Sequence, residues 1–402
     1  MRENIEYLPL KSTKVIDLTD IKGAYCSKLL ADMGCEVIKI EPPSGDTSRL
    51  LAPFAHDDPN PEKSLVFSFY SSNKKSITLN IASAEGKRIL KKLIKTSDVL
   101  VESYSPGYLD SIGLSYQSIC KINPELVMSS ISPFGQDGPK KHYQGTELTL
   151  LASGGFTYEC GVGDEVPCTD PGYMAYDLAG TDAAAGIALA LFHKDLMGQG
   201  QYIDIAIQQS VAFHTFFGVP QWMNDGIYRR RYGAVAINYW PGDIFKTKDE
   251  KYILLMCFVP GQFKTVAEWV GSDALADPMW QDAKQRQDNT DFLRAEIQGL
   301  VSQYDQNDFV EEAQRRHLPA TPVNNIADYI EDPQTVFREA FTVTNHPSIG
   351  KHLLPNTPAV LGWGRKQKPK PAPSLGQHNG QIYQELGLSK NDVLTLKRSG
   401  VI

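Results

Sequence analysis

One segment, residues 171–210, constrains the fold more than any other part of the chain; it reads PGYMAYDLAGTDAAAGIALALFHKDLMGQGQYIDIAIQQS. From residue 180 to 191 it consists mostly of Ala, Gly, Ile and Leu, which predicts a helix that is apolar nearly all round and therefore buried. Glycines at 198 and 200 end this helix, and polar and apolar residues alternate over 201–207 as they do in a strand. The chain is therefore expected to carry a core helix that leads into a sheet.

Asp177 stands where an aromatic, glycine-containing loop gives way to this helix. The first backbone N–H groups of a helix lack partners, and together with the helix dipole they favour an ionised carboxylate at that end. An aspartate in such a place is most often an N-cap. Position alone leaves two interpretations open, an N-cap and a catalytic carboxylate.

Composition limits the class of protein. The 402 residues are enough for two domains, or for one large α/β domain with an insertion. The net charge of −7 argues against nucleic-acid binding as the main function. The N-terminus lacks the apolar stretch of a signal peptide, and no run approaches the length of a membrane span. Neither nucleic acid nor a membrane is therefore expected as a partner.

The six cysteines are scattered along the chain, with no CxxC pair and no histidine at the spacing of a metal ligand. This pattern fits a reduced compartment. We therefore expect a cytoplasmic location and no metal site.

The chain up to about residue 210 alternates strand and helix patterns. Residues 14–18, 23–33 and 36–41 predict strand, helix and strand, a βαβ unit with parallel strands. Further strands are predicted at 76–80, 98–102 and 126–132, with a helix at 84–95. This alternation is typical of an α/β domain. The loop after the first strand, DLTDIKGAY, lacks the G-x-G-x-x-G motif, so NAD binding is not expected.

The pattern changes after residue 220. Two strand-like stretches, GDIFKTK and KYILLMCFV, predict a hairpin, and helical patterns follow at 262–271, 290–303 and 306–316. We therefore expect a smaller α+β domain at 225–325. Residues 365–374 are basic and rich in proline, which favours an extended strap that connects or covers other parts.

No common catalytic motif is present: the sequence has no G-x-S-x-G elbow, P-loop, H-E-x-x-H or kinase signature. The eight histidines form no ligand-like cluster. Asp177 and Glu147 are the two carboxylates that precede small or apolar segments of buried character. From the residues alone, the chain is an α/β enzyme with an unidentified nucleophile.

Six stretches, taken in order over almost the whole chain, carry a family resemblance. They are VIDLTDIKGAYCSKLLADMGCEVIKIEPPSGDTSR, NKKSITLN, DVLVESYSPGYLDSIGL, YDLAGTDAAAGIALALFHKDLMGQGQYIDIAI, PVNNIADYIEDPQTVFRE and PAPSLGQHNGQIYQELGLS. Each is a weak signal alone, but their order and extent are specific. The chain thereby resembles the family III CoA-transferases (the CaiB/BaiF family), which include formyl-CoA and carnitine CoA-transferases.

The resemblance implies a fold. It implies a Rossmann-like large α/β domain that binds CoA, built from residues 1–220 and completed by 330–402. The α+β domain at 225–325 would be joined to it by long connections. The resemblance also implies an interlocked homodimer.

The resemblance implies a reaction as well. CoA would move from an acyl-CoA thioester to a small organic acid, with coenzyme A as a substrate and no prosthetic group. Asp177 would be the nucleophile, forming a mixed anhydride and then an aspartyl-CoA thioester. Such covalent catalysis divides one difficult acyl exchange into easier steps.

Two further residues would complete the catalytic group. Glu147 matches a glutamate that lies beside the nucleophile in formyl-CoA transferase, which implies that it positions and tunes the intermediates; a solvated loop carboxylate is the alternative. Lys22 stands where that enzyme has a glutamine that contacts the active site. A lysine there departs from the family pattern and changes the local charge.

The CoA-contacting residues implied by the resemblance lie in three loops, with one residue further on: Gly23, Leu79, Asn80, Ala82, Ser103, Tyr104, Ser105 and Ser111. Ser105 and Ser111 stand where relatives often carry basic residues, which leaves open how the CoA phosphates are held. The candidate substitutes are Lys39, Arg49, Lys74, Lys75 and Lys141.

Two other functions remain open from the sequence. An acyl-CoA racemase of the same fold relies on a His–Asp pair, but this chain has Thr146 and Glu147 in that place. A racemase needs two acid/base groups on opposite faces of a carbon. A CoA-binding homologue without turnover is the other alternative, and the presence of Asp177 argues against it.

Overall fold

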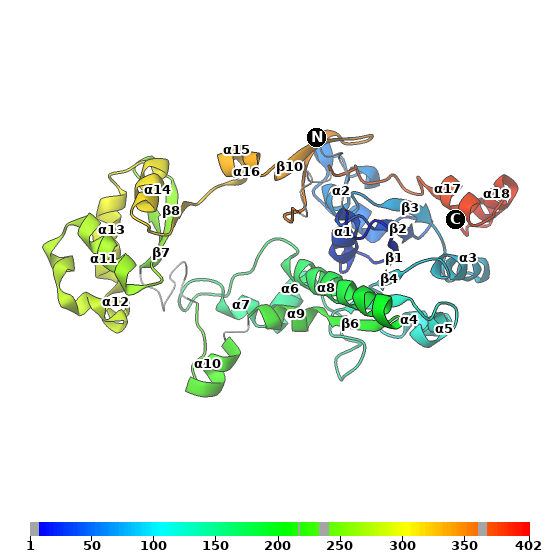
Figure 1. Ribbon diagram of the computed structural model, residues 1–402, viewed down its shortest axis with the longest axis horizontal. Helices are drawn as coiled ribbons and strands as arrows, with labels where there is room; N and C mark the ends of the chain where they lie inside the picture. Colours follow the sequence, from blue (N-terminus) through cyan, green and yellow to red (C-terminus); the bar gives the residue numbers. More distant parts are fainter. Residues whose placement is uncertain (1–7, 216–217, 232, 234–240, 361–367) are drawn as a thin grey trace. The chain divides into compact units, whose positions relative to one another are not determined.

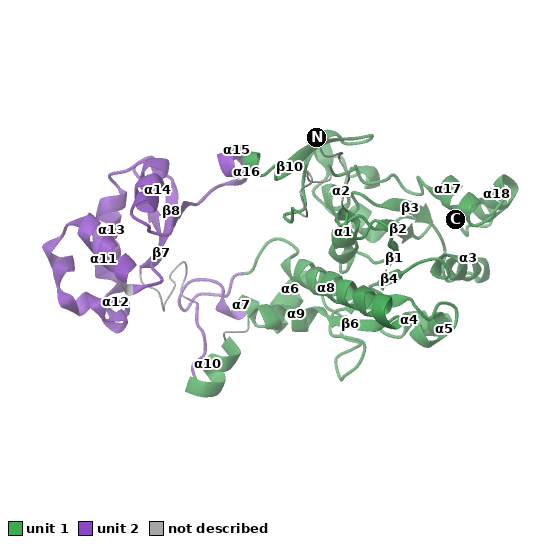
Figure 2. Ribbon diagram, viewed as in Figure 1, with its two compact units in different colours: residues 1–157, 169–226, 336–402 green, residues 158–168, 227–335 purple. Residues whose placement is uncertain are grey.

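The structure is a computed structural model that describes residues 8–215, 218–231, 233, 241–360 and 368–402. The chain divides into two compact units (Figure 2). The first unit comprises residues 1–157, 169–226 and 336–402, and the second comprises 158–168 and 227–335. Residues 158–168 thus belong to the second unit, although they lie within the range 1–220 assigned to the large domain from sequence.

The first unit is built on one parallel six-stranded sheet in the order β3-β2-β1-β4-β5-β6 (Figure 1). Its strands are β1 (Lys14–Leu18), β2 (Glu36–Glu41), β3 (Lys75–Thr78), β4 (Val99–Glu102), β5 (Val127–Ser132) and β6 (Tyr202–Ala206). The predicted α/β fold with a parallel sheet is confirmed. The strand order reverses between β1 and β4, and ligands of such sheets usually bind beside the carboxyl ends of the strands at that point.

Apolar helix faces cover both sides of this sheet. On one side the valines of β1, β2, β4 and β5 pack with α1 (Ala24–Asp32), α6 (Glu147–Ser153), α8 (Met174–Met197) and α9 (Ile207–His214). On the other side isoleucines and leucines of the same sheet pack with α3 (Ala84–Ile94), α4 (Tyr108–Ser111), α5 (Tyr116–Cys120), α17 (Asn379–Glu385) and α18 (Lys390–Arg398). Successive strand residues point to opposite faces, so the central strands β1, β2, β4 and β5 contribute to both cores.

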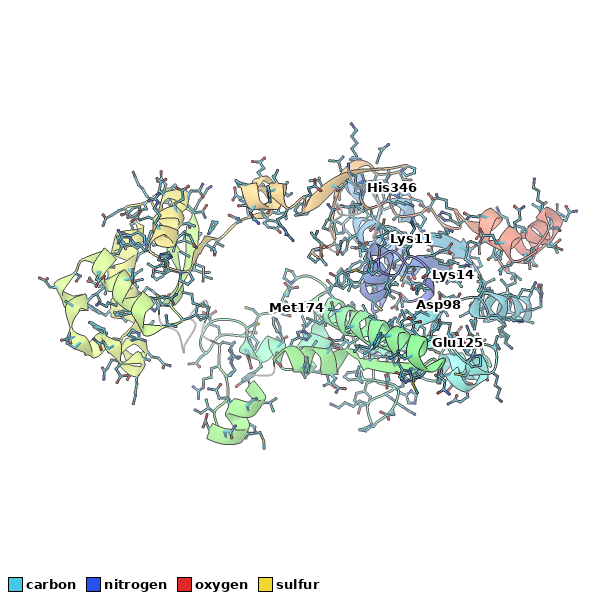
Figure 3. The ribbon with its side chains drawn as sticks, viewed as in Figure 1. Lys11, Lys14, Asp98, Glu125, Met174 and His346 are labelled. Atoms are coloured by element: carbon cyan, nitrogen blue, oxygen red, sulfur yellow. The ribbon has the colours of Figure 1, made fainter. Side chains whose placement is uncertain are left out.

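The helix α8 begins earlier than the sequence pattern indicates. It starts at Met174 with Tyr173 as N-cap, so Asp177 lies in the first turn of the helix instead of preceding it (Figure 3 labels Met174). Gly180 permits α8 to touch α1, because a Cβ there would lie 2.9 Å from the backbone nitrogen of Cys26. The predicted strand ends at Ala206, and Ile207 begins α9.

The expectation that α8 is buried all round is wrong for the single chain. The helix buries a row of small residues against the sheet and α1, including Ala179 and Ala183. Its other side is apolar yet open: the side chains of Leu189, Phe192 and Leu196 are each about two-thirds exposed, at 71%, 65% and 67%.

The sequence IKIEPPSGDTSR at the end of β2 forms a buried polar network. Arg49 donates from Nε and Nη2 to the two carboxylate oxygens of Glu41, at 2.6 and 2.9 Å. Lys39 lies 3.1 Å from a carboxylate oxygen of Asp46 and donates to the carbonyl of Thr19 at 2.7 Å. These ion pairs fix the loops that leave β1 and β2.

The C-terminal residues cover the open edge of the sheet, where β3 is the outermost strand. The backbone N–H groups of Ser76 and Thr78 donate to the side chains of His378 and Asn379, at 3.1 and 2.9 Å. The N–H of Asn80 donates to the carbonyl of Val401 at 2.7 Å. The C-terminal segment, red in Figure 1, therefore pairs with the outermost strand of the N-terminal sheet.

The strap predicted at 365–374 is described in part, because residues 365–367 lie outside the described residues. From residue 368 to 374 the chain has no helix or strand. Its carbonyls accept hydrogen bonds from the first unit, with Arg49 Nη2 donating to Pro373 at 3.1 Å and the N–H of Asn73 donating to Lys370 at 3.2 Å.

The second unit is an antiparallel sheet with helices packed on it. Its strands are β7 (Gly242–Lys246), β8 (Tyr252–Met256) and β9 (Ala320–Pro322). Its main helices are α11 (Pro260–Val270), α12 (Ala283–Asp288), α13 (Thr290–Val301) and α14 (Gln306–Arg315). The predicted hairpin and the three predicted helices are all present.

The remaining elements are short. They are α2 (Leu65–Tyr70), α7 (Phe156–Glu159), α10 (Gly218–Asp225), α15 (Ile326–Glu331), α16 (Pro333–Phe337) and the antiparallel pair β10 (Phe341–His346) and β11 (Gly350–Pro355). Within the described part of the chain, no helix combines the length and apolar character that crossing a membrane requires.

Candidate active site

The carboxylate of Asp177 projects from the first turn of α8 into a group of aromatic rings. The hydroxyl of Tyr70, the last residue of α2, donates to Oδ1 of Asp177 at 2.9 Å. The ring of Tyr70 makes edge contacts with Tyr25 and Tyr173, with centroids 6.0 and 6.3 Å apart. Because Tyr70 is only 6% exposed, its hydroxyl is held in place by packing and Asp177 is oriented through it.

Glu147 caps the helix that carries Asp177. It is the first residue of α6, and its carboxylate accepts the N–H groups of Ala175 at 2.7 Å and Tyr176 at 3.2 Å. These two N–H groups belong to the unpaired start of α8. Glu147 is 7% exposed, so the alternative of a solvated loop carboxylate is wrong.

This arrangement reverses an expectation from the sequence. The carboxylate at the free N–H groups of α8 is Glu147, while the N–H of Asp177 is already bonded to the carbonyl of Tyr173 at 2.9 Å. Burial raises the pKa of Asp177 to about 7, with Glu147 and Asp170 adding repulsion and the Tyr70 hydrogen bond acting in the opposite direction. Within the described residues, the free N–H groups that were expected to favour ionised Asp177 are thus bound by Glu147.

The raised pKa has a chemical meaning. A partly buried carboxylate without a cationic partner is poorly solvated and titrates near neutral pH, which is a frequent property of catalytic groups. Burial also raises the pKa of Glu147, although its two backbone hydrogen bonds oppose this. The site thus combines two carboxyl groups in different roles, one that caps the helix and one that faces the aromatic group.

Lys22 lies in the loop after β1 and pairs with a different acid. Its Nζ binds the carboxylate of Asp20, and Asp20 also accepts from the hydroxyl of Ser103 at 2.8 Å. Among the residues that the structure describes, neither Asp177 nor Glu147 accepts a hydrogen bond from Lys22. The Asp20–Ser103 bond joins the loops after β1 and β4, where the strand order reverses.

The eight residues expected to contact CoA fall along one edge of the sheet. Gly23 is the N-cap of α1, after β1. Leu79, Asn80 and Ala82 follow β3, Ser103, Tyr104 and Ser105 follow β4, and Ser111 ends α4. Since β3 and β4 are separated by β2 and β1, the loops after them lie about 14 Å apart at ordinary strand spacing. The structure therefore brings these residues to one edge without gathering them into one cluster.

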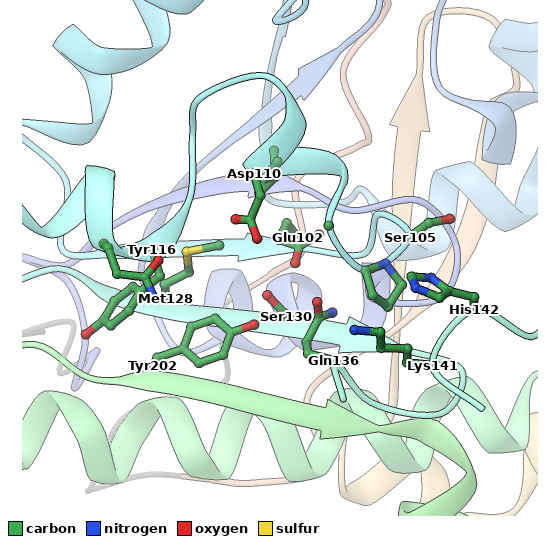
Figure 4. Close-up of a pocket in the computed structure, with 14 residues that line it drawn as sticks. Glu102, Ser105, Asp110, Tyr116, Met128, Ser130, Gln136, Lys141, His142 and Tyr202 are labelled. Atoms are coloured by element: carbon green, nitrogen blue, oxygen red, sulfur yellow. The ribbon is translucent and has the colours of Figure 1, made fainter. Parts of the chain in front are cut away.

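A cavity of about 240 Å³ opens between the loop after β4 and residues 136–142 (Figure 4). Of the eight residues, only Ser105 lines it. Figure 4 shows Glu102, Ser130 and Gln136 close together at its centre. In the described structure, Gln136 Nε2 is buried without a hydrogen-bond partner, and the hydroxyl of Ser130 lies against Glu102 and Tyr202.

The candidate cations differ sharply in accessibility. Lys39, Arg49 and Lys74 are buried and paired with carboxylates. Lys75 pairs with Glu36 at the surface. Lys141 lines the cavity and forms no ion pair within the described ranges. Of the five candidates, Lys141 is thus the one placed to meet an anionic ligand there.

Sequence reasoning missed four residues of this region: Tyr70, Glu102, Ser130 and Gln136. Tyr70 ends the aromatic run LVFSFY, which is separated by two residues from the NKKSITLN stretch and was the available signal. Glu102 is the buried last residue of β4, and burial raises its pKa to about 7. Ser130 and Gln136 carried no pattern that distinguishes them from other strand and loop residues.

Within the described residues, no group of three or more His, Cys, Asp or Glu side chains is arranged to hold a metal ion.

Comparison with known proteins gives the chain its relatives. Succinyl-CoA–L-malate CoA-transferase beta subunit of Chloroflexus aurantiacus is 32% identical, with 98% of each chain covered. Formyl-CoA:oxalate CoA-transferase of Streptomyces avermitilis is 30% identical over 98% of this chain and 99% of the relative. The subunit of succinyl-CoA:(R)-benzylsuccinate CoA-transferase from Thauera aromatica is 29% identical over 97% of both.

The fold has solved counterparts. A CaiB/BaiF family protein from Brucella suis superposes with a TM-score of 0.82 at 27% identity, covering 94% of this chain and 99% of that one. A Mycobacterium tuberculosis protein at 22% identity shares the fold with a TM-score of 0.80. The model of the family described as CoA-transferase family III matches residues 10–379. The resemblance seen in the six sequence stretches is thereby confirmed, and the chain belongs to CoA-transferase family III, whose members transfer CoA between acyl-CoA thioesters and carboxylic acids.

Proposed function

We propose that this CoA-transferase uses Asp177 as a covalent nucleophile between an acyl-CoA and a small carboxylic acid. The observation that carries the proposal is the Asp177 carboxylate itself: partly buried, oriented by Tyr70 through Oδ1, and without a cationic partner among the described residues. A carboxylate is a weak nucleophile in water. Desolvation and a fixed direction of attack make it effective.

The proposed steps are those that the family resemblance implies for an aspartate nucleophile. One oxygen of Asp177 attacks the thioester carbonyl carbon, forming a C–O bond while the C–S bond breaks and CoA leaves as a thiolate. The thiolate then attacks the aspartyl carbonyl carbon of the mixed anhydride, forms an aspartyl-CoA thioester and releases the donor acid. The acceptor acid runs the same steps in reverse. Exclusion of water keeps the intermediates from hydrolysis.

Glu147 and Lys22 have indirect roles in this proposal. Glu147 fixes the first turn of α8 through Ala175 and Tyr176, and so positions Asp177. Lys22 contributes positive charge at the loop after β1, where it is held by Asp20. Both are proposed as positioning and tuning groups.

The CoA moiety is proposed to bind along the carboxyl edge of the sheet, and its anionic part to enter the cavity that Ser105 and Lys141 line. Two features support this placement: the ammonium group of Lys141, which forms no ion pair within the described ranges, and the unpartnered Gln136 Nε2. The contacts at Gly23, Leu79, Asn80, Ala82, Tyr104 and Ser111 remain proposals on the family pattern.

We propose a homodimer, interlocked as in the family. Support comes from the apolar side of α8, where Leu189, Phe192 and Leu196 stay exposed in a single chain. Isolated apolar residues are ordinary on protein surfaces, but a row of them on one helix is typical of an interface. Light scattering tests this directly, and a monomer at micromolar concentration would contradict it.

The test of the covalent mechanism is intact-mass analysis after mixing the protein with a panel of acyl-CoAs, with succinyl-, acetyl- and formyl-CoA first. Hydroxylamine or borohydride traps the intermediate. We expect an adduct on Asp177 that is lost in Asp177→Ala and retained in Asp195→Ala, which removes an exposed carboxylate from the same helix. Exchange of the α-proton in deuterated water without any adduct would contradict the proposal and favour a racemase.

A further inference from the structure

The hydroxyl of Tyr70 is in direct contact with the carboxylate that is proposed to react. It donates to Oδ1 of Asp177 at 2.9 Å, and no hydrogen bond to Oδ2 is found among the described residues. The two carboxylate oxygens are therefore different: one is held by a phenol, and the other is available for attack. Nothing in the family pattern used above assigned a role to this tyrosine.

The position of Tyr70 is enforced by its surroundings. It ends α2, and its ring packs with Ala24 and Val66, and against Tyr25, Phe69 and Tyr173. The ring centroid of Phe69 is 4.8 Å away. A hydroxyl held by this packing needs no reorganisation when charge develops on its partner, which is the condition for effective transition-state stabilisation.

We propose that Tyr70 is a catalytic residue of the transfer, whose hydroxyl stabilises the oxyanion that forms on Oδ1 of Asp177. This inference rests on the proposed function. When CoA thiolate attacks Cγ of the anhydride, a C–S bond forms and the carbonyl electron pair moves onto Oδ1. Collapse restores the carbonyl, breaks the bond from Cγ to the bridging oxygen and releases the donor acid as its carboxylate. The proton stays on Tyr70 throughout.

The electrostatics of the site agree with a phenol that remains protonated. Burial and the adjacent Asp177 raise the pKa of Tyr70 far above its usual value. Among the described residues, the titratable groups that act on Asp177 are Tyr25 on α1, Tyr70 on α2, Glu147 on α6 and Asp170 before α8, and none of these is a cation. Tyr70 is thus the donor that this part of the site offers to negative charge on Oδ1.

The test compares Tyr70→Phe with Tyr383→Phe. The control removes a buried hydroxyl that donates to the carbonyl of Thr78, away from Asp177, and so measures the structural effect of losing such a group. In Tyr70→Phe we expect kcat to fall about a hundredfold to a thousandfold, as for the loss of one oxyanion donor, while KM changes by less than about threefold. Unchanged kcat in the folded variant would overturn the proposal.

A second measurement does not depend on turnover. Carbodiimide labelling of Asp177 as a function of pH reports the pKa of its carboxyl group, which should rise in Tyr70→Phe because a hydrogen bond to the ionised form is lost. A shifted labelling pKa with unchanged kcat would show a structural hydrogen bond only and overturn the catalytic role. If wild type itself forms no Asp177 adduct, the proposed function fails, and this inference fails with it.

Should Tyr70→Phe fail to fold, fluorinated tyrosine at position 70 keeps the ring and changes only the acidity of its hydroxyl. A stronger donor should lower the labelling pKa of Asp177 and change kcat. Equal values of both quantities for all analogues would contradict the proposal.

Discussion

Two groups of buried carboxylates in the first unit differ in their partners. Asp17 and Glu41, at the ends of β1 and β2, are each paired with a buried cation, Lys74 and Arg49. Asp177 has a phenol instead. The consequence is opposite for ionisation: burial alone would raise the pKa of Asp17, but Lys74 and Lys39 hold it well below its usual range. Burial raises that of Asp177 to about 7.

We infer from this difference that the paired carboxylates stabilise the fold and that Asp177 takes part in the reaction. A carboxylate with a buried cation is neutralised and fixed, and it has no reason to react. A carboxylate that is buried without one keeps unsatisfied charge, which a covalent bond to an acyl group removes. The predictions below test whether substitutions at Asp177 change mainly the activity and substitutions at the paired carboxylates change mainly the stability.

The largest effect should be on activity. Asp177→Asn keeps the size of the side chain and can still accept from Tyr70 through its amide oxygen, but it cannot form the anhydride. We expect the rate of CoA transfer to fall by at least about a thousandfold, as when a covalent nucleophile is removed. Steady-state assays with each acyl-CoA check this, and a variant within tenfold of wild type would contradict the role of Asp177.

The next effect should be on stability. Lys74→Met leaves Asp17 buried without its cation, and removal of one partner from a buried ion pair costs about 3–5 kcal/mol of unfolding free energy. Urea denaturation measures this loss. The matched control is Lys141→Met, which removes a cation that lines the cavity and should change stability by less than about 0.5 kcal/mol. Equal losses in the two variants would show that Asp17–Lys74 has no special structural weight.

The two carboxylates should also respond oppositely to neutralisation. Between the unfolded value of 3.8 and the folded value of about 7, Asp177 binds more protons in the native state than in the unfolded state. Stability from this group is therefore complete below pH 4 and is lost as the pH rises to 7. After a discount for solvent screening, Asp177→Asn should stabilise the protein at pH 8 by about 1–2 kcal/mol.

For Asp17 the dependence of stability on pH has the opposite sign. Its lowered pKa gives stability that is present above pH 4 and is lost only in stronger acid, so Asp17→Asn should destabilise the protein at pH 8. Thermal unfolding of both variants at pH 4 and pH 8 checks the signs. If Asp177→Asn is also destabilising at pH 8, the carboxylate is a structural group.

The smallest effect should come from Glu147→Gln. The amide oxygen can still accept an N–H at the start of α8, but the negative charge that repels Asp177 is gone. The acid limb of the pH–rate profile should therefore move to lower pH, by less than about one unit, because the repulsion is only a secondary cause of the shift. An unmoved acid limb would indicate that Glu147 acts on Asp177 by position alone, and a move to higher pH would contradict the repulsion.

The sequence patterns predicted the sheet well because strand and helix periodicity is local. All six strands of the first unit and the hairpin of the second were expected close to their observed bounds. The sequence pattern placed Asp177 just before the helix, whereas α8 begins at Met174, because the aromatic residues before Asp177 do not look helical. The local sequence pattern could not show that Tyr173 is the N-cap and that Met174 to Tyr176 form the first residues of the helix.

The site was predictable in one residue and unpredictable in its partners. Asp177 could be named from the family pattern. Its hydrogen bond to Tyr70 spans 107 residues of sequence, and the capping of α8 by Glu147 spans 28, so neither follows from neighbouring letters. The same limit applies to Lys39, Arg49 and Lys74, whose charges looked available for phosphate until their buried partners were seen.

The covering of β3 by the C-terminal residues has a consequence for biosynthesis. All six strands of the sheet lie before residue 207, yet the outer N–H groups of Ser76 and Thr78 receive their partners from residues beyond 377. A chain still growing on the ribosome therefore carries a nearly complete sheet with an open edge, the kind of surface that pairs with other chains. Loss of residues 378–402, through a premature stop or a protease, would leave that edge permanently unpaired and favour aggregation over an active shortened enzyme.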